Sequence, residues 1–116
     1  MRFLVLLTEP DHFARWDRAD EAERERAFAA YRAFSAMVRE RGSILAGDAL
    51  HEPETARTVR PGPERAVTDG PYAETVEQLG GFYLIDLPTF DDALEAARLL
   101  PPEYTIEVRP TLEVEV

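Results

Sequence analysis

The C-terminal segment, residues 104–116, alternates without interruption between two kinds of side chain, and this pattern constrains the fold more than any other. One set comprises Tyr104, Ile106, Val108, Pro110, Leu112, Val114 and Val116. The other comprises Thr105, Glu107, Arg109, Thr111, Glu113 and Glu115. Successive side chains of a strand point to opposite faces of a sheet, so the period of two predicts a strand with one apolar and one polar face. The chain therefore needs other elements that cover one face of a sheet.

Two amphipathic helices are predicted to provide that cover. Asp20 is a suitable N-cap with Glu23 three residues later, and Gly42 is a suitable end for the helix between them. Its apolar residues recur at steps of three and four: Ala27, Ala30, Tyr31, Phe34, Met37 and Val38. Thr89 is a suitable cap for a second helix, which Pro101 and Pro102 stop. The apolar face of this helix comprises Phe90, Ala93, Leu94 and Ala97.

Strand patterns occupy the intervals between the helices. Residues 3–7 are apolar at consecutive positions, which is typical of a central strand covered on both faces. Residues 43–50 and 81–87 predict two further strands, and residues 58–60 and 66–68 predict a short hairpin around a proline–glycine turn. The order of elements indicates an α+β fold of the ferredoxin-like βαββαβ type with an inserted β-hairpin.

The predicted topology leaves one face of the sheet open. Right-handed crossovers from the first and third strands place both helices on the same face. The opposite face would then expose apolar side chains of residues 3–7 to water. A large exposed apolar patch is typical of an interaction surface, so we expect a homodimer that buries this face.

Composition limits the partners and the compartment. A length of 116 residues predicts a single domain, and the net charge of −10 opposes binding to nucleic acid and to anionic membranes. The chain has no cysteine, which favours a reducing compartment. The apolar opening is five residues long, which is shorter than the apolar region of a signal peptide. These observations predict a cytoplasmic protein.

Three motifs together resemble a known family. They are Val-Thr-Asp-Gly-Pro-Tyr-Ala-Glu-Thr at residues 67–75, the pair Gly80-Gly81 before a strand, and Glu-Val-Arg-Pro at residues 107–110. The chain resembles the YCII-related family, in the branch named for its Asp-Gly-Pro-Phe (DGPF) motif, although Tyr72 stands in place of the phenylalanine. The resemblance extends over about residues 1–110, and we assign residues 1–116 to one such domain. It implies a dimeric α/β-barrel arrangement.

The resemblance does not supply a reaction. Some YCII-related proteins carry a histidine on the first helix and an aspartate after the second, proposed as a catalytic pair, and a dehydrochlorinase is among them. Here Tyr31 stands at the equivalent helix position, and residues 99–102 are Leu-Leu-Pro-Pro. The domain is thus expected to be either a small-molecule enzyme, active or degenerate, or a regulatory module associated with an extracytoplasmic-function sigma factor. A cofactorless monooxygenase is a third reading, based on fold analogy alone.

Five residues are candidates for binding a small anionic or aromatic ligand in a cleft between the sheet and the first helix. They are Tyr31, Asp69, Tyr72, Glu74 and Arg109. Arg109 is the expected anchor for an anion, because a guanidinium binds a carboxylate through two parallel hydrogen bonds. Structural roles are the alternatives: an Asx-turn for Asp69, a helix rim for Tyr31, and an ion pair for Arg109.

The two histidines form no recognisable metal motif. His12 lies in a predicted loop beside Phe13 and Trp16, which are expected to plug the core or form a lid. Strand parity places Asp48 and His51 on opposite faces, so they are not expected to pair. The sequence has neither a zinc-binding spacing of histidines nor a glycine-rich phosphate loop, and we predict no metal and no cofactor.

Overall fold

The computed structural model describes residues 1–115, and Val116 lies outside the described residues. Four antiparallel strands form the main sheet in the order β2-β5-β1-β6, the order of a ferredoxin-like α+β fold. The strands are β1 (Arg2–Pro10), β2 (Ser43–Ala49), β5 (Glu77–Asp86) and β6 (Thr105–Pro110). The helices are α1 (His12–Arg18), α2 (Glu21–Arg41) and α3 (Phe90–Ala97), and a short 3₁₀ turn spans Pro53–Thr55. The predicted fold class is confirmed.

The predicted caps set the starts of helices α2 and α3. The Asp20 carboxylate accepts a hydrogen bond of 2.8 Å from the backbone N–H of Glu23 at the start of α2. Thr89 does the same for the N–H of Asp92 at 3.1 Å, which begins α3. Gly42 follows the last turn of α2, as predicted. Each cap satisfies a backbone donor that the helix itself leaves free, so both helix starts are locally encoded.

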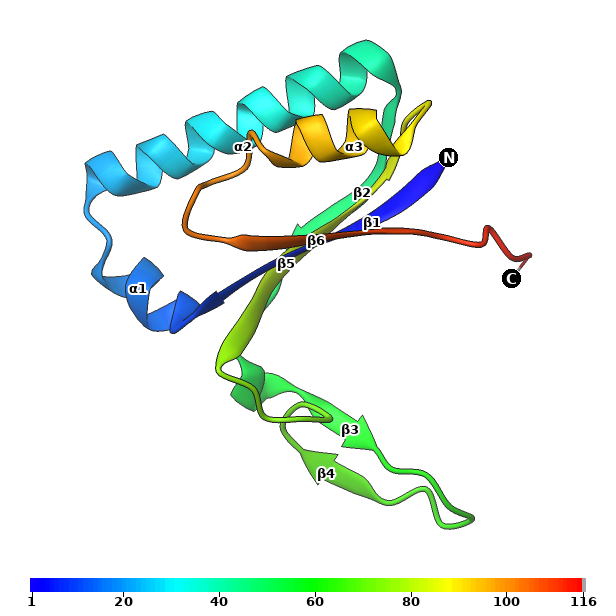
Figure 1. Cartoon of the computed structure of the whole chain (residues 1–116). Coiled ribbons are helices and arrows are strands. Elements are labelled where there is room, and N and C mark those ends of the chain that lie inside the picture. Colours follow the sequence, from blue (N-terminus) through cyan, green and yellow to red (C-terminus); the bar gives the residue numbers. More distant parts are fainter. Residues whose placement is uncertain (116) are drawn as a thin grey trace.

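Helices α2 and α3 lie side by side over one face of the sheet (Figure 1). The side chains between these layers form the core, whose largest fully buried members are Phe3, Phe34, Ile85, Leu87, Val5 and Val38. Alternate residues of β1 supply this core, and the ring of Phe34 from α2 lies 4.6 Å from that of Tyr83. The core therefore joins the two inner strands, β1 and β5, to helix α2.

Within residues 1–115, no helix or strand covers the opposite face of the sheet. Register pairs Leu4 with Leu84 and Leu6 with Phe82, and these four side chains share the face away from the helices. They are half-buried, whereas their neighbours Phe3 and Val5 are buried. Both faces of the first strand were predicted to be covered. In the described part of a single chain, only the face toward the helices is covered.

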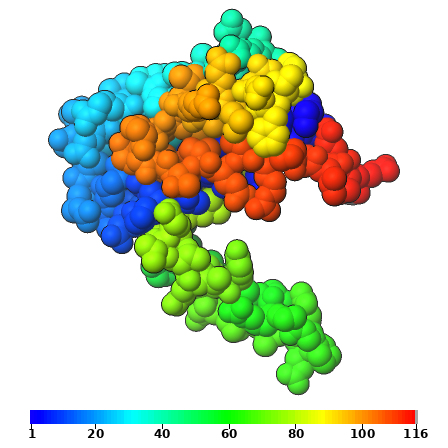
Figure 2. Space-filling view, viewed as in Figure 1, coloured from blue at the N-terminus to red at the C-terminus, as the bar shows by residue number. Residues whose placement is uncertain are grey.

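The inserted hairpin projects from the body as an arm. Strands β3 (Arg57–Val59) and β4 (Val67–Asp69) pair only with each other and extend away from the main sheet (Figures 1 and 2). The backbone N–H of Gly70 donates a hydrogen bond of 2.8 Å to the carbonyl of Ala56, which closes the base of the arm. The radius of gyration is 16.0 Å, against about 13 Å for a compact chain of this length. The arm accounts for this extended shape.

Several boundaries differ from the sequence predictions, and β1 continues three residues beyond the predicted end at Leu7, to Pro10. Residues 12–18, predicted as a loop, form helix α1, and β5 begins at Glu77, so both of its glycines lie inside the strand. β6 ends at Pro110 although the alternation continues, and Leu112 is 92% exposed. The cause is the length of its neighbour: β1 begins at Arg2, whose carbonyl accepts the final hydrogen bond, from Thr111. Beyond that point the described part of the chain offers no strand to pair with the alternating residues.

Candidate functional site

A carboxylate is buried at the end of the central strand. The alternation that places Phe3, Val5 and Leu7 in the core continues to Glu9, whose exposed fraction is 2%. An isolated charge in such a position would be strongly destabilised, so a buried carboxylate requires paired donors. Glu9 is therefore the starting point for the local chemistry.

His12 and Arg15 are the partners of Glu9. Asp11 adopts a left-handed conformation (φ 51°), and the chain turns there directly into α1. This turn brings Nδ1 of His12 to 2.6 Å from Oε1 of Glu9. Arg15, one turn along α1, donates through Nε to Oε2 at 2.8 Å and through Nη2 to Oε1 at 2.7 Å. Burial raises the pKa of Glu9, but the hydrogen bonds from Arg15 and His12 outweigh it and hold that pKa below its ordinary value.

A glycine in β5 makes room for the imidazole ring. A Cβ atom added at Gly80 would lie 2.5 Å from Nε2 of His12 and within 2.8 Å of two ring carbons. The Gly80-Gly81 motif therefore has a steric function here, because any larger residue at position 80 would displace the histidine. On its other side the imidazole ring lies 5.5 Å from the ring of Tyr104.

The environment of His12 selects one tautomer. The ionised carboxylate of Glu9 only accepts hydrogen bonds, so Nδ1 must carry the proton that it donates. The neutral ring then has an unprotonated Nε2, which makes no hydrogen bond with any residue among 1–115. Only 8% of His12 is exposed, so Nε2 of the neutral ring is a proton acceptor on a nearly buried residue and makes no hydrogen bond within residues 1–115.

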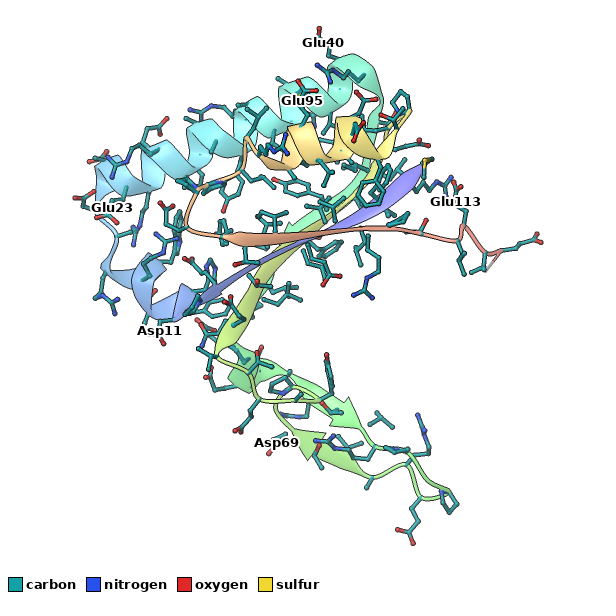
Figure 3. All side chains as sticks on the ribbon, in the orientation of Figure 1. Asp11, Glu23, Glu40, Asp69, Glu95 and Glu113 are labelled. Carbon is teal, nitrogen blue, oxygen red and sulfur yellow. The ribbon has the colours of Figure 1, made fainter. Side chains whose placement is uncertain are left out.

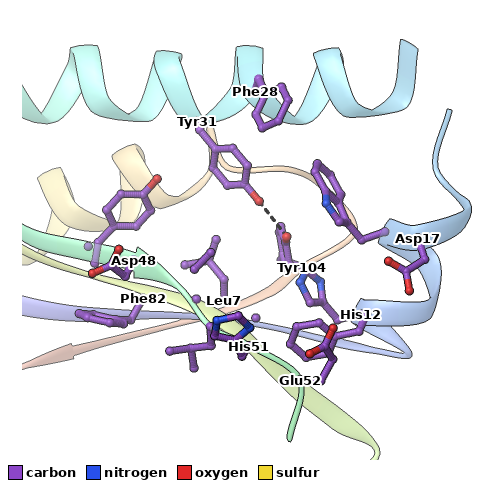
Figure 4. Close-up of a pocket in the computed structure, with 18 residues that line it drawn as sticks. Leu7, His12, Asp17, Phe28, Tyr31, Asp48, His51, Glu52, Phe82 and Tyr104 are labelled. Atoms are coloured by element: carbon purple, nitrogen blue, oxygen red, sulfur yellow. Dashed lines mark hydrogen bonds between the residues drawn. The ribbon is translucent and has the colours of Figure 1, made fainter. Parts of the chain in front are cut away.

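Two tyrosines lie above the imidazole. The hydroxyl of Tyr31, from α2, is 2.8 Å from that of Tyr104, which precedes β6 (Figure 4). Burial, together with the mutual hydrogen bond, raises the pKa of Tyr31, and burial raises the pKa of Tyr104. Both phenols thus stay protonated at neutral pH. One hydroxyl donates to the other, so the pair retains one proton that is free for donation to a ligand.

These groups line a cleft of about 530 Å³ between α1, α2 and the end of the sheet (Figure 4). Its walls are mainly aromatic and its mouth carries polar residues. The lining residues include His12, Phe13, Trp16, Asp17, Phe28, Tyr31, Asp48, His51, Glu52, Phe82, Tyr83 and Tyr104. A cleft of this size, largely apolar with a few convergent polar groups, is typical of a small-molecule site.

Of the five residues that sequence analysis selected, Tyr31 lines this cleft and the other four do not. Asp69 lies on the projecting arm, where it pairs with Arg57 at 3.1 Å (Figure 3). Tyr72 and Glu74 follow it in the segment after the arm, and Tyr72 is 82% exposed. The Asp69–Glu74 segment therefore lies at the base of the arm, away from the cleft in the single chain.

Arg109 lies on the open face of the sheet. Its register partner is Leu4, and its Nη2 atom is 2.6 Å from Oε2 of Glu107, two residues earlier on β6. Both side chains are well exposed to solvent. This pair is on the face opposite α2 and α3, so Arg109 is separated from the cleft by the sheet.

Metal binding has no support from the described residues. Among residues 1–115, no group of three or more histidine, aspartate or glutamate side chains converges on a position where it could hold a metal ion. Asp48 and His51 both line the mouth of the cleft, but no hydrogen bond joins them within this part of the chain. The same residues include no helix that is long and apolar enough to cross a bilayer.

Glu9, His12 and Arg15 were missed by sequence analysis, although a signal for them is present. The period of two that begins at Phe3 places Glu9 on the apolar face of its strand. A glutamate on such a face requires partners, and the nearest basic groups along the chain are His12 and Arg15. The sequence did not predict the left-handed turn at Asp11, which brings the side chains of His12 and Arg15 into contact with Glu9.

Fold and site together define a ferredoxin-like α+β domain with a carboxylate–imidazole pair beside an aromatic cleft. Residues 1–113 match the YCII-related domain, and the chain belongs to this family. It is also 55% identical over 51 residues to an uncharacterised protein of Rhizobium meliloti (strain 1021). That match covers 40% of the present chain and 41% of the relative, so the chain spans less than half the length of that protein.

The ion pair at Glu9 predicts a pH-dependent contribution to stability. Replacing Glu9 with glutamine should lower the free energy of unfolding by about 1–2 kcal/mol at neutral pH, because hydrogen bonds to a charged group are lost. The pKa of Glu9 is lower in the folded protein than its ordinary value of 4.5. The contribution is therefore fully present above the ordinary value and is lost as the pH falls through the folded value.

Urea denaturation of both proteins at neutral pH and at about pH 3 would measure this difference. The difference in the free energy of unfolding between the wild type and Glu9→Gln should be large at neutral pH and smaller at about pH 3. Glu25→Gln is the control, since Glu25 forms an exposed ion pair with Arg32 at 2.7 Å, and such pairs contribute roughly 0–1 kcal/mol. An equal effect of both substitutions at neutral pH would contradict the role assigned to Glu9.

Proposed function

We propose that this YCII-related protein is an enzyme that removes a proton from a small cyclic molecule, with His12 as the base. One arrangement carries the proposal: His12 lines the cleft, Glu9 holds its Nδ1 at 2.6 Å, and in the neutral ring this leaves Nε2 as the proton acceptor. A buried imidazole whose second nitrogen is oriented by a carboxylate is a common arrangement for a general base.

The residues divide the work as follows. Nε2 of His12 takes a proton from a C–H or O–H group of the ligand, and the ring becomes an imidazolium. Glu9 stabilises this cation, and the two bonds from Arg15 hold the carboxylate in place. The electron pair left on the ligand needs a donor, and the free hydroxyl proton of the Tyr31–Tyr104 pair is available for that role. The proton thus ends on His12, and the negative charge left on the ligand is stabilised by the tyrosine hydroxyl, so the step needs no other group.

Deuterium exchange tests this function without knowledge of the natural substrate. Wild-type protein in D₂O would be mixed with small ring compounds that carry weakly acidic C–H groups, such as cyclohexenones and dihydroxybenzenes, and loss of proton signals would be followed by NMR. Exchange faster than in buffer is expected for at least one compound. The rate should fall when a non-exchangeable aromatic molecule occupies the cleft. Exchange that persists unchanged under saturation of the cleft would contradict the proposal.

The open sheet face supports a further part of the proposal, a homodimer. Leu4, Leu6, Phe82 and Leu84 form a half-buried apolar centre, flanked on β6 by Glu107 and Arg109. Two such faces packed together would remove this apolar surface from water. The Glu107–Arg109 pair of each protomer would then lie near the interface. In this arrangement Arg109 pairs with acids of its own or the partner chain rather than with a ligand.

Sedimentation at micromolar concentration is expected to give twice the mass of 13.1 kDa. Leu6→Glu should shift the protein to the monomer, because it places a charge in the apolar centre of the face. Leu99→Glu, at an exposed position after α3 and so on the helix side of the sheet, is the control and should leave the dimer intact. A monomeric wild-type protein at micromolar concentration would rule the dimer out.

We also propose a cytoplasmic location, which the absence of cysteine favours. The run Asp69-Gly70-Pro71-Tyr72 supports placement in the DGPF branch of the family, with tyrosine in the fourth position. Its place at the base of the arm is consistent with a structural turn, since Gly70 has φ 89° and Thr58 donates a hydrogen bond of 2.7 Å to its carbonyl.

A further inference from the structure

We infer that the cleft selects its ligand by charge: it binds aromatic amines and neutral aromatic molecules and rejects aromatic carboxylates. This inference rests on the proposed function only in using the same cleft, and it concerns binding rather than proton transfer. It follows from the charges at the mouth, the aromatic walls and the unpartnered nitrogen of His12.

The charged lining residues of the cleft are acidic. Asp17, Asp48 and Glu52 lie around its mouth, and among the described lining residues there is no arginine (Figure 4). The chain contains no lysine at all, so arginine is its only permanently charged cation besides the N-terminus. The net charge of −10 adds a long-range potential of the same sign. A carboxylate approaching the mouth is therefore repelled, and an ammonium group is attracted.

The arginines near the cleft, among them Arg15 and Arg24, are not lining residues. Arg15 donates to both oxygens of Glu9, so its charge is neutralised within the buried cluster. Arg24 lies against the Trp16 ring, 5.6 Å from its centroid, and donates to the Trp16 carbonyl at 3.1 Å. His51 is the remaining titratable group at the mouth, where it stands between Leu50 and Glu52.

Aromatic side chains form the walls. Trp16 from α1 and Phe28 from α2 pack edge to face at 5.8 Å, and Phe13, Tyr31, Tyr83 and Tyr104 continue the surface inward. Such walls favour a flat ring. Aromatic faces also attract cations and do not attract anions. The walls and the acidic mouth therefore both favour a positively charged ligand over a negatively charged one.

Inside the cleft, His12 adds a second requirement. Its side chain is 10% exposed, and Nε2 makes no hydrogen bond with any residue among 1–115, so the site lacks a hydrogen-bond donor at this point. A ligand that places an N–H or O–H group against Nε2 satisfies the nitrogen, whereas a carboxylate brings only acceptors. The ligand should therefore have a flat ring, a hydrogen-bond donor and no negative charge, and aromatic amines and alcohols meet all three requirements.

Three ligands of nearly equal shape test the inference: benzylamine, benzyl alcohol and benzoate. Titration calorimetry or NMR titration at low salt should give the tightest binding for benzylamine and the weakest for benzoate. We expect a ratio of roughly tenfold or more between these two, because several exposed carboxylates each contribute modestly. Equal affinities, tighter binding of benzoate, or no binding of any of the three at millimolar concentration would overturn the inference.

A matched pair of triple variants locates the source of the selection. Asp17→Asn, Asp48→Asn and Glu52→Gln combined should bring the affinities of benzylamine and benzoate within about threefold of each other. Glu40→Gln, Glu64→Gln and Asp91→Asn combined change the net charge equally at exposed sites outside the cleft, and they should preserve the ratio. A ratio lost equally in both triple variants would overturn the assignment to the mouth.

The outcomes also separate this inference from the proposed function. If benzylamine binds more tightly than benzoate but no compound shows catalysed exchange, the inference on charge holds and His12 is a binding group only. Catalysed exchange together with equal binding of benzylamine and benzoate would sustain the base and overturn the selection.

Discussion

Replacing His12 with glutamine is expected to lower the rate of catalysed deuterium exchange by about 10²–10⁴-fold, because a positioned general base contributes a factor of this size. Glutamine fills much of the space of the imidazole and can still meet Glu9 through its amide. It has no basic nitrogen to replace Nε2 in the cleft. NMR exchange rates for the two proteins at equal concentration would measure the change.

The unfolding temperature of His12→Gln should stay close enough to that of the wild type for both proteins to be folded during the assay. His51→Gln provides the informative comparison, since His51 is the other histidine of the chain and is exposed at the mouth of the cleft. If exchange were lost in His51→Gln and retained in His12→Gln, the base would be assigned to the wrong histidine.

Replacing Gly80 with alanine is expected to lower the free energy of unfolding by about 2–5 kcal/mol. The added Cβ would lie 2.5 Å from Nε2 of His12, closer than atoms can approach, and the neighbouring atoms are a buried ring rather than a flexible chain end. Overpacking of this kind costs about 1–3 kcal/mol. A shift of the ring would further weaken its bond to Glu9, which contributes about 1–2 kcal/mol. Chemical denaturation measures the sum.

A double-mutant cycle with His12→Ala isolates the steric cause. If the clash is responsible, Gly80→Ala should cost much less in a protein that already lacks the imidazole. Leu79→Ala, at the exposed neighbouring position of β5, is the control for general sensitivity of the strand. Additive effects of Gly80→Ala and His12→Ala would contradict the proposed fit between glycine and ring.

Local signals predicted the framework of the fold. Asp20 and Thr89 begin their helices as the sequence indicated, because a cap depends on residues within one turn. The alternation from Tyr104 to Arg109 predicted the covered and open faces of β6 for the same reason. Its end at Pro110 could not be predicted, since that end depends on where the non-local partner β1 begins. Helix α1 was missed because its seven residues carry no side-chain cap.

The candidate site was predicted only in part. Tyr31 was placed on the inner face of its helix by spacing, and the structure puts it in the cleft. Asp69 and Tyr72 were selected from a family motif, but a motif does not specify the direction in which a hairpin leaves the sheet. Arg109 was assigned correctly to the polar face of its strand. Which face held the cleft was decided by the packing of α1 and α2, which involves contacts far apart in sequence.

The arm has a consequence for how this domain can vary. Its two ends meet at the hydrogen bond between Gly70 and Ala56, and its strands pair only with each other, so the thirteen residues between these ends form a loop that is already closed. Lengthening, shortening or exchanging this loop would leave the hydrogen-bond ladder of the sheet and the Glu9–His12 contact untouched. Related chains can therefore diverge in size and in surface here while inheriting the same interior, and a foreign peptide grafted between Ala56 and Gly70 would be displayed on an intact domain.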